Sequence, residues 1–157
     1  MNVVSLWQYT HQALIGALDH PTWEREVWPQ RTLKDAITNL TAMEYVLCEV
    51  LESMLDDSPT PTLDRFVVDY DRFNREEIAE RRTLSGDEVL EEYRYIYAQT
   101  SRLMTLMPGR KWRERGTLPW YGPDFSLEEF VVLFLFEHKR EAVAQIMQAN
   151  HEHSTIS

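Results

Sequence analysis

The stretch from Leu33 to Met54, LKDAITNLTAMEYVLCEVLESM, is the part of the sequence that decides the fold. Its apolar side chains recur at spacings of three and four residues: Leu33, Ala36, Ile37, Leu40, Met43, Leu47, Val50, Leu51 and Met54. Because an α-helix completes a turn every 3.6 residues, this spacing places them on one face. A helix with such a face must bury it against other elements. The stretch therefore predicts a long, packed helix over residues 31–55.

Three further segments repeat the same pattern. Their apolar stripes are Leu6, Tyr9, Ala13 and Ala17; Val89, Tyr93, Ile96, Tyr97, Thr100, Leu103, Met104 and Met107; and Leu127, Val131, Phe134, Leu135, His138, Ala142 and Ile146. The seven prolines, which would break a helix interior, all lie outside these stripes. Ser85 with Glu88 and Ser126 with Glu129 match the capping box that begins many helices.

The stripes and caps together predict helices over residues 5–18, 31–55, 86–107 and 126–150. We expect a shorter helix within 64–82 and no sheet, because no alternating apolar run is long enough for one. Four long helices with substantial connections are typical of a four-helix bundle. The predicted fold is therefore all-α, a four-helix bundle with an extra short helix in the crossover between its second and third helices.

Composition limits the function classes. The 157 residues suit one domain over 1–150, followed by a polar tail over 151–157. With 16 Lys+Arg against 26 Asp+Glu the net charge is −10, which disfavours binding to nucleic acid or to anionic membranes. Phe130 to Phe136, the longest apolar run, is far shorter than the roughly 20 residues of a membrane span. The lone Cys48 excludes an internal disulfide, and we expect a buried structural thiol in a cytoplasmic protein.

His138 is the most informative candidate for chemistry. The sequence contains no nucleotide-binding loop, no zinc-protease or serine-hydrolase motif, and none of the Glu-x-x-His pairs of di-metal bundles. His138 lies on the inward stripe of the last helix, between Phe134 and Ala142. Inward side chains on facing helices build the metal sites of bundles, but a single histidine there also fits a hydrogen-bonded residue at the edge of the core. Spacing alone leaves both interpretations open.

Three stretches resemble one known family. Trp28 to Glu44, WPQRTLKDAITNLTAME, resembles a pattern in which Trp, a Lys-Asp pair, a His-Leu pair and Glu open the second helix. Glu137 to Ile146, EHKREAVAQI, resembles the fourth-helix pattern His-x-x-Glu-His-x-x-Gln-Ile, and Phe73 to Leu90 resembles the lead into helix three. Over residues 5–148 the chain resembles the DinB-like superfamily of four-helix bundles, which includes the DfsB and ClbS branch.

The resemblance implies a divalent metal held by three histidines, with open positions for hydrolysis or thiol transfer. Carried over by position, the ligands fall at Asn39, His138 and Ala142, so only His138 is retained. An amide oxygen is a poor substitute for imidazole at a zinc or nickel site, and a methyl group has no donor atom. We therefore expect no metal. A zinc or nickel site rebuilt with Glu44 and Glu141 is the alternative.

Loss of the ligands leaves a cavity that we expect to bind a small molecule. Its predicted lining is Asn39, Glu44, His138, Ala142, Tyr9, Tyr93 and Tyr97, although the tyrosines also fit a core with satisfied hydroxyls. One alternative is a hydrolase or thiol transferase with a rearranged metal, or a metal-independent enzyme in which His138 activates water. Another is a structural bundle. The resemblance also implies a homodimer.

Three remaining segments have two interpretations each. The basic stretch from Gly109 to Gly116 is a solvated connection or a site that steers an anionic ligand. Pro119 to Phe125 is an aromatic plug over the end of the bundle or the mouth of the cavity. His151 and His153 lie in the polar tail, where we expect frayed structure or adventitious metal binding.

Overall fold

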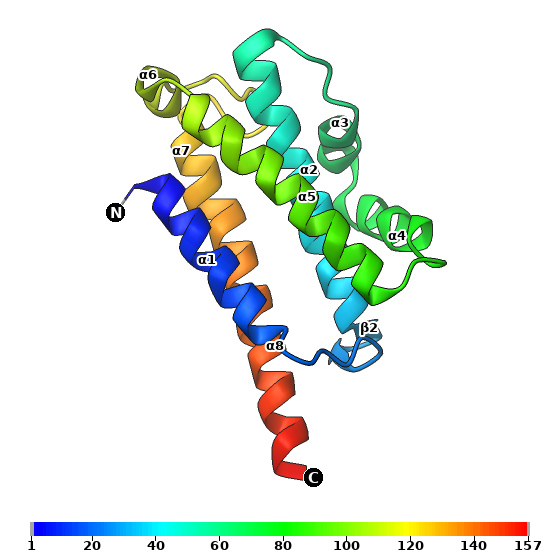
Figure 1. The fold of residues 1–157 in the computed structure, drawn as a ribbon. Coiled ribbons are helices and arrows are strands. Elements are labelled where there is room, and N and C mark those ends of the chain that lie inside the picture. Colours follow the sequence, from blue (N-terminus) through cyan, green and yellow to red (C-terminus); the bar gives the residue numbers. More distant parts are fainter. Residues whose placement is uncertain (1, 157) are drawn as a thin grey trace.

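Four long helical segments carry the fold of the computed structural model, which describes residues 2–156 (Figure 1). They are α1 (Val3–Ala17), α2 (Leu33–Asp56), α5 (Gly86–Leu106) and a continuous run of α7 (Leu127–Glu129), η1 (Phe130–Phe136) and α8 (Glu137–Ile156). The helices predicted over 5–18, 31–55, 86–107 and 126–150 are confirmed, and the all-α class with them. The η1 segment is π-helical, a rare form that often occurs near functional sites.

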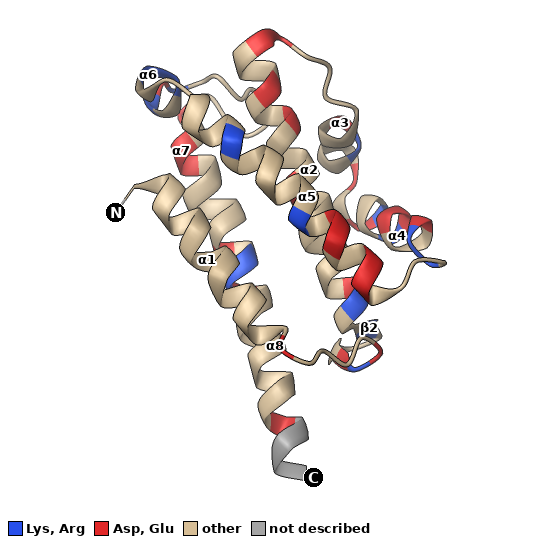
Figure 2. Cartoon of the chain, in the orientation of Figure 1, with Lys and Arg blue, Asp and Glu red and all other residues tan. Residues whose placement is uncertain are grey.

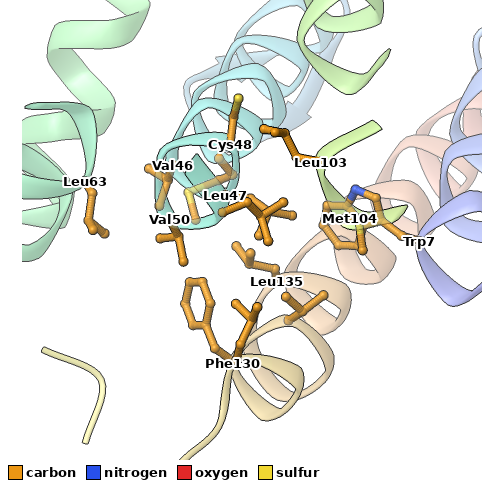
Figure 3. Close-up of a cluster of buried hydrophobic side chains, with 14 of the residues drawn as sticks. Trp7, Val46, Leu47, Cys48, Val50, Leu63, Leu103, Met104, Phe130 and Leu135 are labelled. Atoms are coloured by element: carbon orange, nitrogen blue, oxygen red, sulfur yellow. The ribbon is translucent and has the colours of Figure 1, made fainter. Parts of the chain in front are cut away.

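The long helices associate as two pairs. In Figure 1, α2 lies against α5, and α1 lies against η1 and α8. Apolar side chains fill the space between the pairs, and Figure 3 labels part of this core: Trp7, Val46, Leu47, Cys48, Val50, Leu63, Leu103, Met104, Phe130 and Leu135. Cys48 is buried here, as predicted. Its thiol donates to Glu52 at 3.0 Å, and burial raises its pKa to about 12, so the group is not a reactive thiolate.

Polar caps fix where the long helices begin. Both predicted capping boxes are present, because Ser85 and Ser126 each accept from the backbone three residues on. Thr32 and Asp35 form a third box at the start of α2. The first helix begins earlier than predicted because the Asn2 side chain accepts from the backbone N–H of Ser5 and caps it.

The crossover between α2 and α5 holds two short helices where one was predicted. They are α3 (Pro61–Val68) and α4 (Tyr70–Glu80). Asp69 lies between them with an extended backbone, which ends α3, and its side chain caps the start of α4. Arg81 then ties the end of α4 to α5. Its guanidinium donates to both carboxylate oxygens of Glu92, at 2.8 and 3.0 Å, the two-point geometry that makes such pairs strong.

Two local predictions were wrong. A short hairpin of β1 (Glu26–Trp28) and β2 (Arg31–Thr32) occurs where no sheet was expected. The hairpin turns at Gln30, whose φ of 63° lies in the left-handed region. The geometry of this turn, and not an alternating pattern of apolar residues, produces the hairpin. The basic stretch is a mostly exposed connection between α5 and α7, in keeping with one of its two interpretations, and it contains a short helix, α6 (Gly109–Arg113). The tail continues α8 to Ile156 instead of fraying, and the side chain of His153 lies outside those described.

Acidic residues gather on the N-terminal half of α5 and near the C-terminal end of α2, α4 carries both signs of charge, and α6 is basic (Figure 2). Lys111 of α6 donates to the backbone oxygen of Met54 in the last turn of α2, where a cation offsets the negative end of the helix. Among the residues described, no helix combines the length and apolarity that crossing a membrane requires.

Gly86→Ala should destabilise the fold by about 1–3 kcal/mol, measured by urea unfolding followed by circular dichroism. An added Cβ would overlap the indole of Trp23, which is held in place by a 3.0 Å bond to Asp87. Gly16→Ala is the matched control. No heavy atom lies within 4 Å of its added Cβ, so it should stabilise α1 by about 0.5–1 kcal/mol. If Gly86→Ala and Gly16→Ala were equally stable, the close packing of the Trp23 indole on Gly86 would be contradicted.

Candidate functional site

A cleft of about 700 Å³ is open to solvent and bounded by the hairpin, α2, α4 and α8. Its lining is mixed, with both charges and several amides: Trp28, Pro29, Arg31, Asp35, Ala36, Asn39, Tyr70, Asn74, His138, Arg140, Glu141, Ala142, Ala144 and Gln145. Three of the predicted pocket residues, Asn39, His138 and Ala142, therefore line one cleft. The hairpin and α4, which the sequence did not place there, supply much of the remaining wall.

Asn39 is the centre of the polar network in this cleft. Its Nδ2 donates to the hydroxyl of Tyr70 at 3.1 Å and to Oδ1 of Asn74 at 2.8 Å. Its Oδ1 lies 2.5 Å from Nε2 of His138. The amide thus joins α2 to α4 on one side and to α8 on the other. With both donors and the acceptor engaged, the Asn39 side chain is held in one orientation.

The same network determines the tautomer of His138. Because Asn39 Oδ1 only accepts, Nε2 of His138 must carry the proton that it donates. Burial lowers the pKa of His138, the Glu141 carboxylate opposes that shift, and Lys139 adds to it, so the ring is neutral at pH 7. In a neutral ring with Nε2 protonated, Nδ1 keeps its lone pair. His138 can therefore accept a hydrogen bond or a proton at Nδ1.

The residues at the family's ligand positions do not fit a divalent metal. The His138 imidazole and the Asn39 amide are hydrogen-bonded to each other, and Ala142 offers only a methyl group. In the part of the chain that the structure describes, no three His, Cys, Asp or Glu side chains are grouped as a metal site. Glu44, one of the two carboxylates with which a site could be rebuilt, lies outside the cleft and is held by Lys139. This donor set is unsuited to zinc or nickel.

Glu44, Tyr93 and Tyr97 surround a second feature that sequence reasoning missed, the buried cation of Lys139. Its Nζ lies 2.6 Å from Oε1 of Glu44, and both side chains are at most 2% exposed. The ammonium also lies 4.2 Å from the ring centre of Trp7, 4.9 Å from Tyr93 and 5.3 Å from Tyr97. Such distances allow cation–π attraction. We call these five residues the Lys139 cluster.

A sequence signal for the cluster exists in hindsight. Lys139 lies four residues after Leu135 and four before Val143, both buried, so it occupies an apolar stripe. A lysine there is buried and must be paired. The ion pair of the cluster is closed off from solvent, since Glu44 and Lys139 are each 1% exposed. Glu44 Oε2 and Trp7 Nε1 are buried within it and have no hydrogen-bond partner among the described residues.

His11 packs against the outer side of the cluster. Its ring stacks on Tyr97 with centres 3.6 Å apart, and Nδ1 lies 3.2 Å from the Tyr93 hydroxyl. Burial, followed by the charges of Lys139 and Arg94, lowers its pKa to about 4. The neutral ring therefore completes the aromatic shell around a cation that would repel its protonated form.

The prediction that Tyr9 lines the cavity was wrong. Tyr9 is 67% exposed, because α1 buries the stripe Val3, Trp7, Thr10 and Leu14 instead of the predicted one. The two stripes differ by about one residue, and the large indole of Trp7 decides which one faces the core.

A second cleft of about 480 Å³ is lined by Phe66, Val67, Tyr70, Trp120, Tyr121, Phe130, Phe134 and His138. Trp120 and Tyr121 of the aromatic stretch thus line this second cleft, whereas no residue of Pro119 to Phe125 lines the Asn39–His138 cleft. Trp120 and Tyr121 also pack on Phe130, each with ring centres 5.0 Å away. Arg115, at the end of the basic stretch, donates to the backbone of Asp124 and pairs with Glu129, so it fastens this segment.

Comparison with protein-family models, curated proteins and solved structures finds no match to this chain. The DinB-like assignment consequently stays a prediction drawn from the quoted residues.

Lys139→Met should destabilise the fold by about 3 kcal/mol, because it leaves the Glu44 carboxylate buried without its partner. The double variant Glu44→Leu/Lys139→Met should recover most of that loss, since no charge remains to be buried. Urea unfolding of both single variants and the double variant gives the coupling energy. Arg140→Met, which breaks an exposed pair with Glu137, is the control and should change stability little. If the losses of stability of the two single variants simply add in the double variant, Glu44 and Lys139 are not energetically coupled, which would contradict the ion pair proposed for the cluster.

Stability should fall as the pH drops from 7 to 5, in part through His11. In the unfolded chain His11 takes up a proton near pH 6.5, whereas the folded chain does so only near pH 4. Protonation in this window therefore favours unfolding, and stability held above pH 6.5 is lost on acidification. His11→Phe keeps a ring against Tyr97 and removes the group that takes up the proton. The stability of this variant should therefore fall less between pH 7 and pH 5 than that of the wild type. Urea unfolding at both pH values tests this, with the exposed His20→Asn as a control that should behave like wild type.

Proposed function

We propose that this chain is a four-helix bundle of the DinB-like type that lacks the family's three-histidine metal centre and binds a small molecule in the Asn39–His138 cleft. The observation that carries the proposal is the network in which Asn39 joins His138, Tyr70 and Asn74 at the wall of a cleft of about 700 Å³. A concave site of this volume with a few convergent polar groups is typical of small-molecule binding.

The placement of the polar groups supports binding rather than a purely structural role. A structural bundle would fill the space beside His138 with side chains, but the cleft there is open. The network also leaves bonding capacity unused. The Tyr70 hydroxyl can donate its proton, Asn74 Nδ2 has no hydrogen bond to any residue that the structure describes, and His138 Nδ1 has a lone pair. A ligand can engage all three without disturbing Asn39.

A hydrolytic enzyme is the second candidate, favoured by the free lone pair on Nδ1 of His138. A neutral imidazole held at its other nitrogen is oriented as a general base. In such a reaction Nδ1 would take the proton of a water molecule as its oxygen attacks the substrate. This route needs no metal, in agreement with the donor set of the cleft.

Binding is tested by screening a fragment library against the ¹⁵N-labelled chain by NMR. Fragments should shift the backbone signals of Asn39, Asn74 and His138. Ala144→Trp projects a ring from an exposed position in the cleft wall and should weaken these fragments at least tenfold. Ala98→Trp, exposed on α5 and outside the cleft, should leave them unchanged. Fragments that bind elsewhere, or that tolerate Ala144→Trp, would contradict the proposal.

His138→Gln separates binding from hydrolysis. Glutamine retains a donor toward Asn39 but has no basic nitrogen, so a binding protein should still bind the fragments, with a loss limited to the one hydrogen bond at Nδ1. Ester analogues of the bound fragments are then followed by NMR for release of acid. Wild-type turnover that His138→Gln abolishes would establish the enzyme, and absence of turnover in both would favour binding alone.

A further inference from the structure

We propose that the ligand of this site is an aromatic molecule with an uncharged, hydrogen-bonding head, whose ring occupies the second cleft while its head binds at Asn39. The proposal rests on the proposed function, because it assigns a class of ligand to the same site. Its basis is that Tyr70 and His138 line both clefts. A molecule that contacts these two residues therefore meets a polar wall on one side and an aromatic wall on the other.

The second cleft is suited to a flat ring. Six of its eight lining residues are Phe, Tyr or Trp, and the other two are Val67 and the neutral His138. The lining therefore carries no charge. They come from three separate segments: α3 with the start of α4, the loop before α7, and η1. Phe66 meets Phe134 edge-on at 6.0 Å, and Trp120 meets Phe130 in the same way at 5.0 Å. Rings so arranged offer both edges and faces to an added ring.

The first cleft is suited to a head without net charge. Its four charged lining residues are two cations and two anions. Arg140 is already paired with Glu137 at 2.7 Å, and Asp35 accepts from the backbone of Thr32 at 3.0 Å. The two signs of charge balance in this lining, so neither an anionic nor a cationic head meets an excess of opposite charge, whereas an uncharged head avoids the cost of desolvating an ion.

The groups left unused by the Asn39 network specify what the head must carry. Tyr70 and Asn74 offer donors, and His138 Nδ1 offers an acceptor. A matching head needs an acceptor together with a donor, as a primary amide has. An aromatic amide is thus the simplest member of the proposed ligand class.

The test measures binding of 2-naphthamide to the full chain by isothermal titration calorimetry. It should bind at least tenfold more tightly than its anionic analogue 2-naphthoate and its cationic analogue 2-naphthylmethylamine. Acetamide, which has the head alone, is titrated by NMR and should shift Asn39 and His138 with much weaker affinity.

Val67→Asp is the decisive variant, because Val67 is 45% exposed and lines the aromatic cleft, so the change adds a charge there without opening the core. It should weaken 2-naphthamide at least fivefold and leave acetamide unchanged. Val68→Asp is the matched control, being the next residue of α3, 84% exposed and outside this cleft. Trp120→Ala, which removes a ring from the wall, should act like Val67→Asp.

The outcomes separate the two proposals. If acetamide binds beside Asn39 but 2-naphthamide is no tighter, or if Val67→Asp and Val68→Asp behave alike, the ring assignment is overturned and the binding site stands. If neither probe shifts Asn39 or His138, the proposed site itself fails. A sedimentation experiment in which Val67→Asp dissociates a dimer would overturn the ligand assignment in favour of a protein contact at the aromatic cleft.

Discussion

The buried ion pair of Lys139 and Glu44 is the constraint on which the helix arrangement depends. Removing an ammonium and a carboxylate from water costs several kcal/mol per ion, which only close pairing and further polar contacts offset. Here the pair spans α8 and α2, while the rings around the cation come from α1 and α5. A shift of α2 or α8 by a turn would leave a charge buried without its partner, and a shift of α1 or α5 would remove aromatic rings from around the ammonium. The cluster therefore fixes the register of all four long helices at one level.

This register also creates the separation between the charged interior and the neutral cleft. Consecutive residues on a helix point about 100° apart, so fixing Lys139 toward the core turns His138 toward α2 and α4. There it meets Asn39, five residues before Glu44 on the same helix. The two contacts between α2 and α8 thus differ in kind. One is ionic and sealed from solvent, and the other is neutral, hydrogen-bonded and open to a ligand.

Periodicity and capping residues were sufficient to predict the long helices, because both signals are local. The contents of the site depend on which face each helix presents, and a stripe of apolar residues determines this only to within about one residue. A difference of one residue places Tyr9 on the surface instead of in the cavity. Glu44 lies outside the cleft because it pairs with Lys139. Tyr70 and Asn74 were missed because they come from the crossover, where two short helices and a capping aspartate replace the single helix that was predicted.

The burial of Lys139 also divides the primary amines of the chain into two chemical classes. Of the three lysines, Lys34 donates to an exposed backbone oxygen and Lys111 is half-buried at the end of α2, whereas Lys139 is enclosed on all sides. Reagents that acylate or methylate amines meet the first two on the folded chain and reach the third only after the helices separate. The same barrier protects Lys139 from acetylating enzymes and from proteases that cut after lysine. The fraction of molecules modified at this one side chain therefore records how many of them have opened at least once.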